Sequence, residues 1–129
     1  MVPNPPNPPA MTDTQIIDAR ALERLKEWGG DKLAGQMVRL FLKNSGTRMD
    51  QIRQGAESGD LDETERGAHS LKSSAANIGA EVVRTFATRV ESAALEKDVD
   101  AVRRLLPELE TAFSDAIAEL ETIEKGFVE

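Results

Sequence analysis

Residues 60–79, with the sequence DLDETERGAHSLKSSAANIG, have the pattern of one amphipathic helix. Apolar residues recur at three- and four-residue steps, which places them on one face of a helix. They are Leu61, Ala68, Leu71, Ala75 and Ile78. Acidic residues at positions 60, 62 and 63 lie where a helix N-terminus favours negative charge, and Gly79 is suited to end the helix. The stretch therefore predicts a helix that packs its apolar face against a core.

The segment before it, residues 31–58, shows the same periodicity, with Asp31 as a candidate cap and Gly59 as the stop. Its apolar stripe consists of Leu33, Met37, Leu40 or Phe41, Ser45, Met49, Ile52 and Ala56. Glycines at positions 35, 46 and 55 each cost roughly 1 kcal/mol against Ala in a helix interior. Tertiary packing must therefore hold this long helix, and a kink near Gly46 stays open.

Residues 14–28 predict a short opening helix, capped by Thr12 or Asp13 and stopped at Gly29 and Gly30. Its apolar positions are Ile16, Ala19, Leu22 and Leu25. Two more helices follow Gly79, one ending near residues 97–98 and one covering residues 99–123. Their stripes are Val83, Phe86, Val90, Ala94 and Leu95, and then Val99, Val102, Leu106, Leu109, Phe113, Ala116, Leu120 and Ile123. Pro107 either kinks the last helix or marks a start just before it.

These segments predict an all-α fold, an antiparallel up-down four-helix bundle with an additional short N-terminal helix, because short connections favour antiparallel neighbours. Strands are not expected, since Tyr is absent and the Val, Ile and Phe residues are too sparse to alternate. Residues 1–11 hold five of the six prolines and predict a disordered tail. Residues 12–129 then form one helical bundle domain.

Composition excludes several classes of function. The 129 residues carry a net charge of −7, which argues against nucleic-acid binding, because neutralising phosphates takes a surplus of Lys and Arg. The chain has no Cys, no apolar run of membrane-spanning length and no signal-peptide pattern at its start, so we expect a cytoplasmic location and no membrane association. Nucleotide-binding loops and hydrolase motifs are absent, and one His without Cys makes a metal site improbable.

His69 is the one histidine, displaced by about 100° from Ala68 on the predicted helix, at the edge of the apolar stripe or in solvent. Residues three, four and seven positions away share its face; they are Glu65, Arg66, Lys72, Ser73 and Ala76. Lys72 can neutralise an anion held on the imidazole, while Ser73 and Ala76 leave room for another protein. Composition alone would favour an ordinary exposed histidine over a functional one.

Residues 68–80, AHSLKSSAANIGA, closely resemble the signature of histidine-containing phosphotransfer (HPt) domains, with Ala before the His and Leu-Lys at the second and third positions after it. The wider layout is also similar: Ile17-Asp18 at the start, a Gly-Gly break, a long helix, the His helix and two further helices. The resemblance covers roughly residues 14–125. Ser73 departs from it, since many members have Gly at that position, although Ser is also small.

The resemblance implies that His69 accepts a phosphoryl group from a receiver aspartate, through Nε2, and passes it to another receiver. Lys72 would then pair with the phosphoryl oxygens, and Gly79 would be a structural stop. The domain would be a phosphocarrier without kinase activity, with no metal or other cofactor of its own. The magnesium ion would come from the receiver. Implied partners are receiver domains of hybrid histidine kinases and of response regulators, and we expect a monomer.

Hairpin geometry about Gly59 places His69 at the level of residues 48–52 on the preceding helix. A docking surface is therefore expected from Arg48, Met49, Arg66, Ser73 and Ala76, although Met49 and Ile52 have a core interpretation too. The alternative function is a helical adaptor that binds receiver domains or other signalling proteins without carrying phosphate. A general-base enzyme is disfavoured, because no second acid, base or oxyanion group converges near His69 in the sequence.

Overall fold

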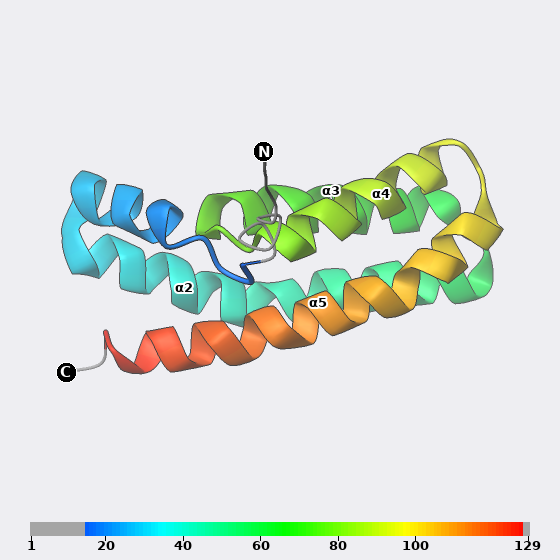
Figure 1. The fold of residues 1–129 in the computed structure, drawn as a ribbon. Helices are drawn as coiled ribbons and strands as arrows, with labels where there is room; N and C mark the ends of the chain where they lie inside the picture. Colours follow the sequence, from blue (N-terminus) through cyan, green and yellow to red (C-terminus); the bar gives the residue numbers. More distant parts are fainter. Residues whose placement is uncertain (1–14, 128–129) are drawn as a thin grey trace, which may run out of the picture.

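The computed structural model describes residues 15–127, which form helices and no strand. The helices are α2 (Ala19–Ser58), α3 (Leu61–Ile78), α4 (Glu81–Leu95) and α5 (Val99–Lys125) (Figure 1). Each packs on the next, and α5 packs back on α2, which closes a bundle. The expected all-α fold is confirmed. No helix within residues 15–127 has the length and apolar character of a membrane span. The predicted tail, residues 1–11, lies outside the described residues.

Helix α2 is broken at the two glycines that were expected to stop the opening helix. Gly29 and Gly30 have non-helical backbone angles, and Gly30 has φ of 72°, a value that glycine adopts without strain. The segment before the break folds back beside the longer segment after it, at the end of the bundle where α5 finishes (Figure 1). No other residue of α2 has non-helical angles, so the helix continues through Gly46 without a break.

The opening helix begins at Ala19 rather than at residue 14, and Asp18 caps it in place of the expected Thr12 or Asp13. The Asp18 side chain accepts a hydrogen bond from the backbone N–H of Arg20 at 2.9 Å. The backbone N–H of Asp18 donates to the carbonyl of Gly79 at 2.7 Å. This bond ties Asp18, whose backbone angles are extended, to the α3–α4 turn. Thr12 and Asp13 lie outside the described residues.

The helix that carries His69 has the predicted ends. The Asp60 side chain accepts a hydrogen bond from the N–H of Glu63, and Gly79 ends the helix with φ of 81°. Gly59 ends α2 in the same left-handed conformation. In α5 the alternative of a helix start just before Pro107 is wrong, because the helix begins at Val99 and continues through Pro107.

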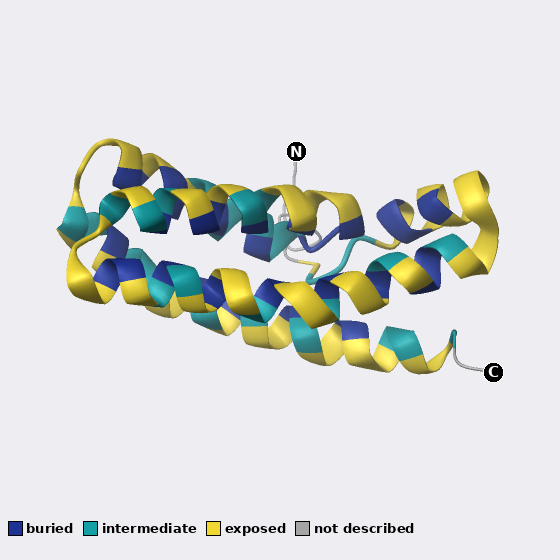
Figure 2. Cartoon of the chain, turned by 180° about the vertical axis from the view of Figure 1, so that it is seen from behind, coloured by how far each residue is buried: buried dark blue, intermediate teal, exposed yellow. Residues whose placement is uncertain are grey.

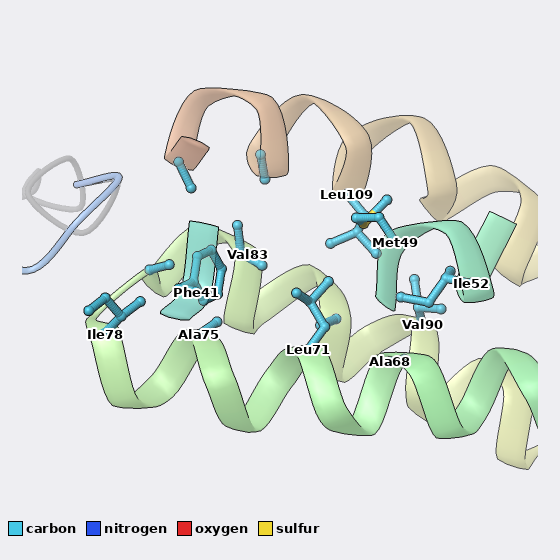
Figure 3. Packing of buried hydrophobic residues seen from close by; sticks show 14 of the residues in the cluster. Phe41, Met49, Ile52, Ala68, Leu71, Ala75, Ile78, Val83, Val90 and Leu109 are labelled. Atoms are coloured by element: carbon cyan, nitrogen blue, oxygen red, sulfur yellow. The ribbon is translucent and has the colours of Figure 1, made fainter. Parts of the chain in front are cut away.

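Buried apolar residues from all four helices form one core (Figures 2 and 3). The largest fully buried side chains include Met49 and Ile52 of α2, Leu71 of α3 and Leu109 of α5. Leu40 and Leu95, two candidates for the core stripes, are exposed instead. The sequence left the choice between Leu40 and Phe41 open, and Phe41 is the one that lies in the core.

Two glycines of α2 are expected to respond oppositely to Ala. A Cβ at Gly55 would lie 2.9 Å from the backbone carbonyl oxygen of Asp60 and would collide with Thr64, whereas a Cβ at Gly46 meets nothing within 4 Å. Gly55→Ala should therefore lower the free energy of unfolding by about 1–3 kcal/mol, through overpacking. Gly46→Ala should raise it by about 0.5–1 kcal/mol, through helix propensity. Urea unfolding of both variants measures this, and equal shifts would contradict the close α2–α3 contact.

Candidate functional site

His69 stands on the outer face of α3, as the helical geometry predicted. Its side chain is 59% exposed, while Ala68 and Leu71 beside it are fully buried in the core. The burial of Ala68 and Leu71 fixes the rotation of α3 about its axis. The imidazole is therefore held in solvent by a helix that cannot turn without exposing apolar surface.

The closest partner of His69 is Glu91, a residue of α4 that was not predicted. Glu91 Oε2 lies 2.7 Å from His69 Nδ1, and Glu91 Oε1 lies 2.7 Å from Lys72 Nζ. The Glu91 side chain is only 11% exposed, so its carboxylate contacts both His69 and Lys72 from the buried side of the site. A signal for it existed in the sequence: position 91 is four residues after Ala87 and three before Ala94, so a carboxylate there lies near the apolar stripe of α4.

The charge of Glu91 determines which nitrogen of His69 carries the proton. Burial raises the pKa of Glu91, but the hydrogen bonds from Lys72 and His69 outweigh it and lower the pKa below its ordinary value. Ionised Glu91 can only accept hydrogen bonds, so Nδ1 of His69 is the donor. In the neutral imidazole the lone pair then lies on Nε2. The site thus presents an unprotonated nitrogen in an exposed position.

The lowered pKa of Glu91 gives this contact a defined pH dependence. A carboxylate whose folded-state pKa is below its unfolded value stabilises the fold above the unfolded value, and this stabilisation is lost as pH falls through the folded value. The ordinary pKa of Glu is 4.5, so the loss begins below that pH. We expect the difference in unfolding free energy between wild type and Glu91→Gln to shrink as pH falls below 4.5. An undiminished difference at pH 3 would contradict the ion pair.

Glu65, His69 and Glu91 are also the one group within residues 15–127 whose ligand atoms converge closely enough for a metal ion, within 4.8 Å of one another. Glu91 already accepts from His69 through Oε2 and pairs with Lys72 through Oε1, so both of its carboxylate oxygens have partners within the protein. The geometry is explained by these contacts, and we assign no metal to it.

A hollow of about 490 Å³ lies beside His69, between α2 and α3. Arg48 and Ser73 of the expected docking surface line it, together with Leu40, Asn44 and Asn77, which were not predicted. We call it the α2–α3 groove. Leu40 is 51% exposed. The groove therefore combines an exposed leucine, two amides and an arginine next to the imidazole.

The other expected docking residues are placed differently. Met49 is 0% exposed, so its assignment to the docking surface is wrong and its core interpretation is confirmed. It lies about 100° around α2 from Arg48 and points into the core with Leu109 (Figure 3). Arg66 is exposed and hydrogen-bonds Glu63 at 2.7 Å, beside a second hollow that it shares with His69. Ala76 is exposed and does not line the groove.

The chain is similar to known proteins both in sequence and in fold. The model of the Hpt domain family matches residues 36–122. Histidine-containing phosphotransfer protein B from Pseudomonas aeruginosa PAO1 has a similar structure, with a TM-score of 0.81 and 20% identity over 87% of this chain and 96% of that one. A histidine-containing phosphotransfer protein from maize superposes with a TM-score of 0.77 and 21% identity, over 91% of this chain and 88% of the maize chain. A search of the curated protein sequences finds no match.

Proposed function

The chain belongs to the Hpt domain family, whose members carry phosphoryl groups in two-component signalling, and on this premise we propose that it relays a phosphoryl group between receiver-domain aspartates through His69. The observation that supports this most is the arrangement of His69, exposed on a rigid helix with Nδ1 hydrogen-bonded to the buried carboxylate of Glu91. A purely structural bundle has no need of a buried carboxylate beneath an exposed imidazole, since burying a charge is costly unless it is paired.

In the proposed transfer, the Nε2 lone pair of His69 attacks the phosphorus of a receiver aspartyl phosphate. The N–P bond forms as the bond between phosphorus and the aspartate oxygen breaks, and the aspartate leaves as a carboxylate. The proton on Nδ1 stays in place, and Glu91 stabilises the positive charge that develops on the ring. Lys72, whose ammonium group lies within this cluster, would pair with the phosphoryl oxygens. The same steps in reverse discharge His69 to a second receiver.

The bundle's part in this reaction is to position the imidazole, and the receiver is expected to supply the acidic residues and magnesium. The protein would therefore act as a phosphocarrier and not as a kinase. Its proposed partners are the receiver domain of a hybrid histidine kinase on one side and a response regulator on the other, each of which binds a monomer of this chain.

We assign receiver docking to the α2–α3 groove, because it is continuous with His69. Leu40 offers an apolar contact there, and Arg48 offers a positive charge to the acidic surround of a receiver aspartate. Ser73 lines the same groove, and Arg66 and Ala76 flank His69 on the exposed side of α3.

Arg48→Ala is expected to weaken receiver binding about tenfold, with a smaller loss at high salt, because the variant removes a charge at the rim of the interface. Lys43→Ala is the matched control, since Lys43 is an exposed cation of α2 that lines neither hollow beside His69. Titration of a labelled receiver measures both affinities. Equal losses in the two variants would place docking elsewhere.

The proposed function is tested by incubating the protein with a phosphorylated receiver domain and following acid-labile, base-stable phosphate. Rapid appearance of such label on this chain, and its passage to a second receiver, would support the relay. The alternative is an adaptor, which binds receivers without carrying phosphate. Receiver binding with no label from any of a panel of phosphorylated receivers would overturn the relay in favour of that alternative.

A further inference from the structure

Glu65 brings a second carboxylate to the phosphoacceptor histidine. It lies one turn before His69 on α3, and its carboxylate is within 4.8 Å of both a ring nitrogen of His69 and the carboxylate of Glu91. Both residues also line a hollow of about 250 Å³, together with Arg48 and Arg66. The Glu65 carboxylate is therefore a close neighbour of the His69 imidazole, and its charge acts on a group bound to the ring.

The two carboxylates beside His69 differ in whether an ion pair neutralises their negative charge. Glu91 pairs with Lys72 at 2.7 Å, so its negative charge is largely neutralised within the cluster. Glu65 makes no ion pair with any of the described residues 15–127. The nearest arginine on the same helix, Arg66, is engaged by Glu63. Glu65 is thus the carboxylate beside His69 whose charge no ion pair among the described residues 15–127 neutralises, and Arg48, which lines the same hollow, makes no ion pair with it.

We propose that Glu65 sets the phosphoryl-transfer potential of His69, by repelling the phosphoryl group and so favouring its discharge to a receiver. This inference rests on the proposed function, because it concerns the phosphorylated state of His69. A carrier must not hold its phosphoryl group too tightly, and Lys72 alone would bias the site toward retention. Glu65 opposes that bias through charge, without contact with the leaving nitrogen.

The chemistry needs no added reactant. In discharge the N–P bond of phosphohistidine breaks as an O–P bond to the receiver aspartate forms, and the electron pair returns to Nε2. Repulsion from Glu65 is present in the phosphorylated state and absent after discharge, so it shifts the equilibrium toward the receiver. For partly exposed charges roughly 5 Å apart, with ordinary salt screening, the expected shift is about twofold to fivefold.

The experiment measures the equilibrium constant for transfer between a phosphorylated receiver and the full chain, as wild type, Glu65→Gln, Glu65→Asp and Glu65→Lys. Neutral Gln should shift the equilibrium about twofold to fivefold toward phospho-His69, Lys further, and Asp little. Each shift should diminish as salt is raised from 50 mM to 500 mM, because the effect is electrostatic. If Glu65 had only a structural role, the equilibrium constants of the Gln, Lys and Asp variants would not follow the charge at position 65.

Glu119→Gln is the matched control, an exposed Glu on α5, a helix that packs on α2 and α4 rather than on α3. It removes the same charge and should leave the equilibrium unchanged. Equal equilibrium constants for wild type and Glu65→Gln, with both proteins labelled, would overturn this inference alone. A shift of the same size in Glu119→Gln would also overturn it, since net charge would then be the cause. Absence of label on every variant and on wild type would instead overturn the proposed function.

Discussion

Replacing His69 with Gln is expected to abolish phosphoryl transfer to this chain. The amide of Gln has similar size and polarity, but it has no nitrogen with an available lone pair, so no N–P bond can form. His69 is the one histidine in the sequence, which leaves no substitute imidazole. Incubation of wild type and variant with the same phosphorylated receiver, followed by detection of acid-labile phosphate, measures the loss.

The variant should remain folded, because the His69 side chain is mostly exposed and lies outside the core. Circular dichroism and urea unfolding provide that control, and a binding titration should show that the receiver still docks. Label at the wild-type level on a folded His69→Gln protein would mean that another residue carries the phosphoryl group.

Glu91→Gln is expected to slow transfer about tenfold to a hundredfold, by analogy with the loss on removing a carboxylate that orients a metal-bound imidazole. A Gln amide can donate its own N–H to Nδ1, and this stabilises the tautomer whose proton lies on Nε2. The nucleophilic lone pair is then lost in part of the population. The substitution also leaves Lys72 without its carboxylate partner. Single-turnover transfer from a phosphorylated receiver measures the rate.

The matched control is Glu81→Gln on the same helix. Glu81 pairs with Arg84 at 2.6 Å, and no described contact joins it to His69. Its replacement should leave the transfer rate unchanged within about twofold, since surface ion pairs contribute little. An unimpaired rate in folded Glu91→Gln would refute the tautomer mechanism while leaving His69 as the carrier.

The local features of the fold could be predicted because they depend on residues close together in the chain. Asp60 and Gly79 specify the two ends of α3 by capping chemistry, and the positions of Ala68 and Leu71 were enough to place His69 on the outer face. The start of the opening helix was predicted too early: the Asp18 cap on Arg20 is a local contact, but the hydrogen bond that ties Asp18 to Gly79, about sixty residues away, comes from the packing of the helices.

The site was only partly predictable for the same reason. Lys72 shares a helix face with His69, so helical periodicity revealed it, whereas Glu91 is 22 residues away on another helix. Met49 was misplaced because one residue along a helix is a rotation of about 100°, and the facing helices decide whether that points to solvent or to core. Periodicity gives the face of each helix, but contacts between helices come from their mutual packing.

The most direct test of the account is the position of the phosphoryl group on the protein. Nitrogen-15 and phosphorus-31 NMR of the labelled chain, phosphorylated by a receiver, identifies the modified atom. We expect the phosphorus to be bonded to Nε2 of His69, with Nδ1 still protonated and hydrogen-bonded to Glu91. Phosphorus on Nδ1, or on any other residue, would contradict the account.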